Sequence, residues 1–195
     1  AKVTNIDDPE KLNRVKCKRI TSDPDVGETD WMYVCSPLAG TNYGLYMMPK
    51  VGDLVLLSYL GGDVHRPFVI GSLWTKDVAA PYKIEGGKNE TFSFRLPSGT
   101  EVVFSEASGK ESVTITAATG AKMALDGEGK KILVTDKDGK NALTMDLGSG
   151  AVTVQADKKL TLSAGTNASI TLDGASGKIT VSGKTGVDIQ TAQLK

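Results

Sequence analysis

Residues able to take part in chemistry are few in this chain, and the most prominent are Asp63 and His65 in the segment GGDVHRP. A carboxylate near an imidazole can serve as a general acid and base. His65 is, however, the only histidine in 195 residues, so neither a Ser-His-Asp triad nor a histidine-rich metal cluster is easily built around it. Because Gly61 and Gly62 precede the pair and Pro67 follows it, we expect a tight turn here and no catalytic residue.

Two other segments contain the residue types of ligand-binding loops. KITVSGKTG ends like a phosphate-binding loop, but Lys178 occupies the position of the first glycine, and no helix is expected to follow. TDKDGKN resembles part of a calcium loop, but its glycine comes directly after Asp138 and no glutamate closes it. We therefore expect turns with capping side chains at both places, and neither a metal nor a cofactor.

The two cysteines, Cys17 and Cys35, lie in separate predicted strands, RVKCKRI and WMYVCS. A single pair makes no disulfide framework, and cysteine behaves as a small apolar residue in such strands. We expect both thiols to be reduced and buried.

The composition argues against several classes of function. Lysine and arginine total 23, and aspartate and glutamate also total 23, so the basic excess typical of nucleic-acid-binding proteins is missing and we expect no nucleic acid partner. No apolar run approaches the ~20 residues of a membrane-spanning helix. Aromatic residues make up only 6% and glycines number 22, which favours an elongated or repetitive shape over one large globule.

The chain has two unlike halves, and the first resembles a small barrel. Its short apolar segments are separated by irregular loops that contain proline. Within residues 48–74, Val55, Leu57 and Tyr59 share one side of a predicted strand, the turn formers GGD follow, and a second strand begins at Phe68. This pattern predicts an antiparallel hairpin.

The same hairpin resembles the OB-fold of contractile-tail spike proteins, a family that includes phage baseplate assembly protein V, the VgrG proteins of type VI secretion and the spikes of extracellular contractile injection systems. The resemblance is carried by glycine, proline, charged and leucine positions at fixed spacings. These motif residues are Pro49, Gly52, Asp53, Gly62, Asp63, Arg66, Pro67, Gly71 and Leu73.

From Ser98 onward the sequence is a repeat of one strand and one turn, roughly every nine or ten residues. Each unit has two apolar residues at positions i and i+2, with Thr, Ser or Lys between and beside them, which predicts one apolar and one wet face. The earlier pairs are Val102/Phe104, Val113/Ile115, Met123/Leu125, Ile132/Val134 and Leu143/Met145. The later pairs are Val152/Val154, Leu160/Leu162, Ile170/Leu172, Ile179/Val181 and Val187/Ile189.

One chain alone buries too little apolar surface in this half to offset the ordering of its backbone, and each isolated strand has unprotected edges. We therefore expect strands of identical chains to stack around one axis. The resemblance implies three chains, in an intertwined triple-stranded β-helix or β-prism. The predicted fold is all-β: residues 1–80 an OB-fold barrel, 81–97 a connector, and 98–195 a homotrimeric spike whose core contains the later apolar pairs.

The resemblance also implies a function: a non-enzymatic spike that a contracting sheath drives through a target membrane. The barrel would face hub, baseplate and tube proteins, and assembly would take place in the bacterial cytoplasm before delivery outside the cell or into a target cell. A separate PAAR-type tip protein with its own metal would cover the C-terminal end. The expected tip contacts are Thr191, Ala192, Gln193, Leu194 and Lys195.

Two alternatives belong to other functional classes. The first is an OB-fold module that binds oligosaccharide or single-stranded nucleic acid on a β-helical stalk, with Trp31, Tyr33 and Tyr43 as stacking residues. The second is a tail-fibre enzyme that cleaves polysaccharide, which requires a carboxylate pair in a groove. The acidic residues lie mainly in the predicted turns of the repeat, so this enzyme ranks last.

Overall fold

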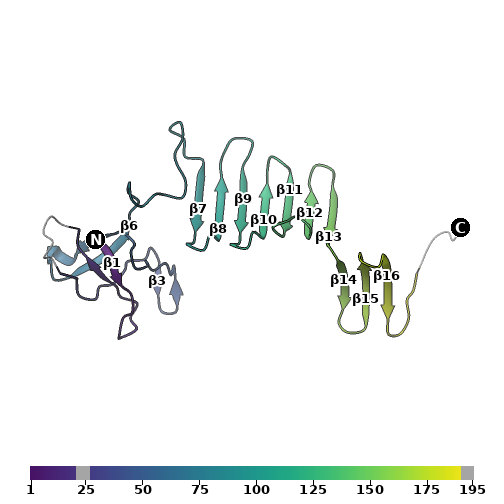
Figure 1. Cartoon of the computed structure of the whole chain (residues 1–195), viewed down its shortest axis with the longest axis horizontal. Coiled ribbons are helices and arrows are strands. Elements are labelled where there is room, and N and C mark those ends of the chain that lie inside the picture. Colours follow the sequence, from purple (N-terminus) through teal and green to yellow (C-terminus); the bar gives the residue numbers. More distant parts are fainter. Residues whose placement is uncertain (21–26, 190–195) are drawn as a thin grey trace. The chain divides into compact units, whose positions relative to one another are not determined.

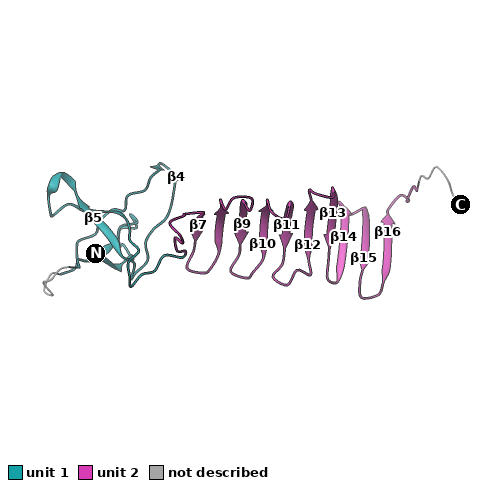
Figure 2. Cartoon of the chain, turned by 90° about the horizontal axis from the view of Figure 1, so that it is seen from above, with its two compact units in different colours: residues 1–81 teal, residues 82–195 magenta. Residues whose placement is uncertain are grey.

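A computed structural model describes residues 1–20 and 27–189, and their regular structure is β-strand apart from one short 3-10 turn. The chain divides into two compact units, unit 1 at Ala1–Pro81 and unit 2 at Tyr82–Lys195 (Figures 1 and 2). The all-β class expected from the sequence is confirmed. Within the described residues, no helix has the length and apolar character needed to cross a membrane.

Unit 1 is built from short strands that pair two by two. Its elements are β1 (Lys2–Asn5), β2 (Lys16–Lys18), β3 (Ala39–Gly40), β4 (Tyr43–Gly44), β5 (Val55–Tyr59), η1 (Leu60–Gly62) and β6 (Pro67–Ser72). The pairs β1 with β2, β3 with β4 and β5 with β6 are antiparallel.

Isolated bridges connect these pairs to one another. The connections are Val15 with Met32, Val34 with Val69 in parallel, and Lys2 with Leu54. Together they join β1, β2, the segment around Met32 and Val34, β6 and β5 in an order that returns to β1. Such a cyclic order agrees with the small barrel that the loop-rich sequence predicts.

The core of unit 1 is small and apolar. Alternation along a strand decides which residues enter it: Val55 on β5 is fully buried, whereas the next residue, Leu56, is 46% exposed. The buried cluster consists of Val3, Val15, Cys17, Met32, Val55 and Val69.

Unit 2 contains two antiparallel sheets in which each strand pairs with its neighbours in sequence (Figure 1). The seven-stranded sheet consists of β7 (Thr91–Arg95), β8 (Glu101–Ser105), β9 (Ser112–Thr116), β10 (Lys122–Asp126), β11 (Lys131–Thr135), β12 (Ala142–Asp146) and β13 (Ala151–Gln155). The three-stranded sheet consists of β14 (Lys159–Ala164), β15 (Ala168–Asp173) and β16 (Lys178–Gly183).

This topology corrects one step of the sequence reasoning. The unprotected strand edges were expected to pair with other chains, but β8 to β12 hydrogen-bond on both sides to strands of their own chain. The short turns of the repeat allow each strand to fold back directly onto the preceding one. Backbone pairing therefore does not require other chains for these strands.

Two strand assignments also differ from expectation. β7 lies inside residues 81–97, where the sequence predicts a connector, because Phe92 and Phe94 form an additional apolar pair. Conversely, the last predicted pair, Val187 and Ile189, follows β16 and lies outside any strand.

Candidate functional site

The most extensive candidate site is one face of the unit 2 sheets, on which the apolar pairs form two continuous columns. The register places apolar residues directly opposite each other from strand to strand, for example Leu125 beside Ile132 and Leu162 beside Ile170. Directly opposed side chains on one face are close enough to pack together. We call this surface the apolar face. On the seven-stranded sheet it comprises Phe92, Phe94, Val102, Phe104, Val113, Ile115, Met123, Leu125, Ile132, Val134, Leu143, Met145, Val152 and Val154.

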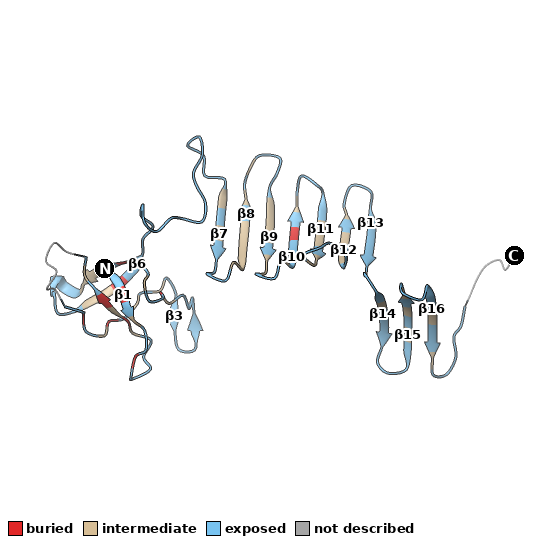
Figure 3. Ribbon diagram, in the orientation of Figure 1, coloured by how far each residue is buried: buried red, intermediate tan, exposed pale blue. Residues whose placement is uncertain are grey.

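The apolar face is open in a single chain. Figure 3 shows the strands of unit 2 mostly as intermediate or exposed, and Ala124, on the opposite face, is the one buried hydrophobic residue in the described part of unit 2. Phe94 is 55% exposed and Val152 is 65% exposed. An exposed apolar surface of this extent marks an interaction surface.

The predicted trimer-core residues are mostly part of this face. Those on β13 are Val152 and Val154, in the columns of the seven-stranded sheet, and those on β14 to β16 are Leu160, Leu162, Ile170, Leu172, Ile179 and Val181, which form two columns of their own in the three-stranded sheet. Val187 and Ile189 are exposed and lie beyond the last strand. The structure therefore brings eight of the ten predicted residues into strand register, and their role in a trimer stays a prediction.

The opposite face is not wet throughout, which corrects the expectation of a purely polar face. Its middle column contains Val103, Ala124 and Leu133 as well as threonines. In the three-stranded sheet the same column is Thr161, Thr171 and Thr180. A β-branched side chain packs well on a pleated surface whether or not it is polar, which explains why both kinds occur.

Aspartates cap the turns between the strands, as the sequence predicts. The Asp146 carboxylate accepts hydrogen bonds from the backbone N–H groups of Gly148 (3.0 Å) and Ser149 (2.9 Å), and Asp136 in the TDKDGKN segment accepts from Lys140 N–H (2.9 Å). Hydrogen bonds to the charged form hold the pKa of both carboxyls below its ordinary value. The carboxylate oxygens of Asp136 and Asp146 therefore accept hydrogen bonds from the backbone of their own turns.

The first motif residues shape the turn that leads into β5. Gly52 has a φ of 99°, a conformation that glycine adopts without a steric penalty. Asp53 closes the turn, because its carboxylate accepts the Lys50 N–H at 2.8 Å. The backbone carbonyl of Asp53 accepts the Val3 N–H at 2.9 Å, so this turn also holds β5 beside β1. Pro49 directly precedes it.

The next motif residues form the reversal between β5 and β6. Gly61 and Gly62 have φ values of 64° and 79°, and the Asp63 carboxylate accepts the backbone N–H of His65 at 2.9 Å. The expected tight turn is confirmed. This hydrogen bond involves the backbone of His65, so Asp63 acts as a turn cap. The backbone N–H of Arg66 also donates to the backbone carbonyl of Asp63, at 3.0 Å.

The remaining motif residues lie on β6 and just after it. Pro67 pairs with Tyr59 at the start of the hairpin, and Gly71 pairs with Leu56 beside a register irregularity. The Leu73 N–H bonds Leu54 O at 3.0 Å. The motif residues therefore determine the path of the β5–β6 hairpin and of the turn that leads into it.

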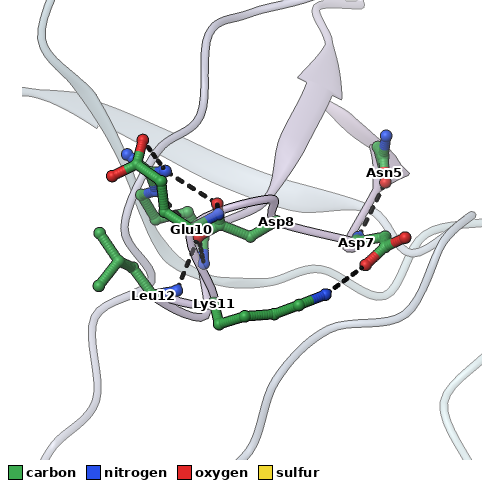
Figure 4. A network of polar contacts seen from close by, with 7 residues as sticks. Asn5, Asp7, Asp8, Glu10, Lys11 and Leu12 are labelled. Carbon is green, nitrogen blue, oxygen red and sulfur yellow. Dashed lines mark hydrogen bonds and ion pairs between the residues drawn. The ribbon is translucent and has the colours of Figure 1, made fainter.

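A network of hydrogen bonds around Asp8, the Asp8 network, was not predicted from the sequence. The buried Asp8 carboxylate accepts hydrogen bonds from the N–H groups of Glu10 and Leu12 (Figure 4). The Arg14 guanidinium donates to both of its oxygens, at 2.8 and 2.9 Å. The Arg14 contact and the backbone donors hold the pKa of Asp8 far below its ordinary value. This network fixes the loop between β1 and β2.

The three aromatic candidates of the alternative function do not form one stacking platform. Trp31 and Tyr33 line a groove of about 500 Å³ with Arg66, whereas Tyr33 and Tyr43 line a separate groove of about 540 Å³. Lys16 Nζ lies 5.3 Å from the centre of the Trp31 ring. A cation already occupies one face of that indole, which leaves less of it for a stacked base or sugar.

The cysteine expectation is half correct. Neither thiol is in a disulfide, and Cys17 is buried in the core, where burial raises its pKa. Cys35, however, is exposed. The neighbouring Met32 and Val34 point toward the core, so the alternation of the chain turns Cys35 outward.

The predicted tip contacts cannot be placed in the fold. Residues 191–195, the predicted tip contacts, fall outside the described part of the chain. Across residues 1–20 and 27–189, no group of three or more His, Cys, Asp or Glu side chains is placed to hold a metal ion.

Comparison with known proteins identifies unit 1. Residues 1–74 match the family described as the type VI secretion system/phage-baseplate injector OB domain. The type VI secretion system spike protein VgrG1c of Pseudomonas aeruginosa is 32% identical over 78 residues, which are 39% of this chain and 11% of that protein. The spike protein VgrG3 of Vibrio cholerae is 29% identical over 91 residues, 45% of this chain and 9% of that protein.

A third relative is the actin cross-linking toxin VgrG1 of Vibrio cholerae, 26% identical over 91 residues, which are 45% of this chain and 8% of the toxin. The chain thus spans about a tenth of the length of these curated relatives. The match covers the hairpin motif and the cyclic strand order of unit 1. Residues 1–74 are thus similar to the OB domain of type VI secretion and phage-baseplate injector proteins, and VgrG spike proteins are among the relatives of this chain.

Proposed function

We propose that this chain forms the homotrimeric central spike of a contractile injection machine. The observation that carries the proposal is the apolar face, which one chain leaves exposed along all strands from β7 to β16. Three copies that turn this face toward a common axis remove it from water. The number three is what the resemblance to spike proteins implies, and strands of five or six residues give each sheet the width of one side of a narrow prism.

The proposed action is mechanical: the spike is pushed through a target membrane, and the work is done by a contracting sheath. Stiffness comes from the backbone hydrogen bonds of the antiparallel ladders and from the shared apolar core. No residue of the chain is assigned a catalytic role. The Asp63 carboxylate caps the turn that contains His65, which is a structural role.

The proposed partners follow from the two ends of the chain. Unit 1 would contact the hub, baseplate and tube proteins, and a PAAR-type protein would cover the C-terminal end through residues 191–195. Assembly in the bacterial cytoplasm and delivery outside the cell, or into a target cell, complete the proposal. Support comes from the match of residues 1–74 to the injector OB domain and from the apolar strand repeat, whose last strand, β16, ends at Gly183.

Electron microscopy of the purified chain tests the trimer proposal. End-on class averages are expected to show three-fold symmetry around a compact centre. Two-fold averages, or particles of a single chain, would contradict it.

Calorimetry tests the tip. A PAAR-type protein encoded beside this chain is expected to bind one copy per trimer, and deletion of residues 191–195 is expected to weaken binding strongly while the trimer stays intact. Undiminished affinity after the deletion would place the partner elsewhere.

A further inference from the structure

Arg66 is the one charged residue of the hairpin motif whose side chain the turns do not use. The carboxylates of Asp53 and Asp63 both accept backbone N–H groups. The backbone of Arg66 is held at both ends, because its N–H donates to Asp63 O at 3.0 Å and its carbonyl accepts the Leu60 N–H at 3.0 Å. Within the described residues, however, its guanidinium has no hydrogen bond or ion pair. The turn therefore fixes the position of a cation and leaves that cation available.

This cation lines a groove of about 500 Å³ on the surface of unit 1, which we call the Trp31 groove. Met32 and Val69 are buried in the core, so the alternation of extended chain turns their neighbours Trp31, Tyr33 and Phe68 outward. All three of these aromatic residues line the groove. Its walls are thus the outward side chains of two adjacent segments of the barrel.

The walls of the Trp31 groove are held by contacts within unit 1. The Val69 N–H donates to Tyr33 O at 2.9 Å and the Cys35 N–H to Val69 O at 2.8 Å, which fixes the two segments against each other. Lys16 Nζ lies 5.3 Å from the centre of the Trp31 ring and holds one face of the indole. A groove that is already formed loses little conformational entropy when a partner binds.

A second available charge lies in the same groove. Asp30 lines it and is exposed, and its carboxylate has no hydrogen bond or ion pair among the residues that the structure describes, with Arg66 or with any other. Two opposite charges that do not neutralise each other match a partner that brings a carboxylate to one and a cation to the other. A nucleic acid brings only phosphates, which Asp30 repels. Trp, Tyr and Arg, which dominate the binding energy of protein–protein interfaces, all occur in this groove.

We infer that the Trp31 groove is a docking site for a segment of a partner protein that carries an acidic, a basic and an apolar side chain within one short stretch. The acidic side chain binds Arg66, the basic one binds Asp30, and the apolar one packs against Tyr33 and Phe68. This inference rests on the proposed contact of unit 1 with the hub protein, and it assigns a site and a recognition chemistry to that contact. The hairpin motif then both shapes the turn and presents Arg66 to the partner.

An exchange of the two charges tests the docking site. Asp30→Arg combined with Arg66→Asp keeps the composition and the net charge but reverses both charges of the groove. The probe is the purified hub protein encoded beside this chain, titrated into the full-length chain by calorimetry. Binding is expected to weaken at least about thirtyfold in the exchange variant and in Arg66→Ala. The control is Asp7→Lys with Lys11→Asp, an exposed ion pair outside the groove, which should leave the affinity unchanged.

Cys35 provides an independent readout, because its exposed thiol lines the groove whereas Cys17 is buried. N-ethylmaleimide is expected to label Cys35 in the chain alone, and the hub protein should slow this labelling in the unaltered chain but not in the exchange variant.

Equal affinity of the unaltered chain and the exchange variant would overturn the docking site and leave the proposed contact with the hub protein standing. A Cys35 thiol that is already protected in the chain alone would assign the groove to a second copy and would also overturn the docking site. No binding of the hub protein to the unaltered chain would overturn both proposals.

Discussion

Substitution of one residue on the apolar face provides the sharpest mutational prediction. Leu162 lies opposite Ile170, whereas its neighbour Thr161 lies opposite Thr171 on the other face of the same strand. We predict that Leu162→Asp abolishes assembly and that Thr161→Asp leaves it intact. Both variants add one carboxylate to β14, so the change in net charge is matched while the face of the strand differs.

The magnitude follows from burial. Fully burying a leucine side chain is worth about 1.5–3 kcal/mol, and Leu162 is still 55% exposed in one chain, so assembly buries about half of that value, ~1–1.5 kcal/mol per chain. Loss of this burial in three chains costs about 3–4.5 kcal/mol per trimer. Three carboxylates in an apolar core add several kcal/mol each for desolvation. The sum is comparable with the whole stability of a typical domain, ~5–15 kcal/mol.

The assay is light scattering at several pH values, with Leu162→Asn as a further control. Three clustered carboxyls in an apolar site have a raised pKa, so the penalty of Leu162→Asp is present above that pKa and declines as the groups become protonated. Leu162→Asp is therefore expected to regain part of its assembly near pH 4, whereas Leu162→Asn should not respond. Equal damage from Thr161→Asp would show that the apolar face is not the interface.

Three further outcomes are expected. Asp8→Asn should lower the melting temperature of unit 1 by several degrees at pH 7. The stability that comes from the depressed pKa of Asp8 is fully present above the ordinary aspartate pKa near 3.8 and is lost as pH falls toward the depressed value, so the difference from the unaltered chain should shrink over that interval. The exposed Asp7→Asn is the control, and an unchanged difference between pH 7 and pH 2 would refute the assigned role. Gly62→Ala should destabilise unit 1 by about 1–2 kcal/mol through its positive φ, whereas Gly71→Ala, which meets nothing within 4 Å and has no positive φ, should be nearly neutral in urea unfolding. Tryptophan fluorescence should not change on titration with a thymidine oligonucleotide or cellohexaose; a change that Tyr33→Ala removes would favour the OB-fold binding module instead.

Local pattern was sufficient to predict much of the fold. The signature hairpin, its capping Asp63 and the apolar columns depend on alternation and turn residues, which are written in consecutive positions. The break between the two sheets at residues 156–158 is also local, because these residues lack the positive-φ residue found in each hairpin, although strand spacing alone does not reveal it. The strand that contains Phe92 and Phe94 was not predicted, because prolines and glycines surround it in the sequence.

Other features depend on contacts between distant residues and could not be predicted in this way. The Asp8 network requires a loop path that brings the Arg14 guanidinium back to the Asp8 carboxylate. The spacing of these two residues in the sequence does not by itself predict that path. The exposure of Cys35 depends on which side of its segment meets the core. What covers the apolar face also depends on contacts between residues that are distant in sequence. The sequence predicts that the face exists, and the structure shows that one chain leaves it exposed.

The mass of the purified chain in solution tests the central claim most directly. Multi-angle light scattering at micromolar concentration is expected to give three times 20.5 kDa, because only assembly covers the apolar face. A mass of 20.5 kDa with a strand-rich circular dichroism spectrum would contradict the account, since it would show that unit 2 is stable in water with that face exposed.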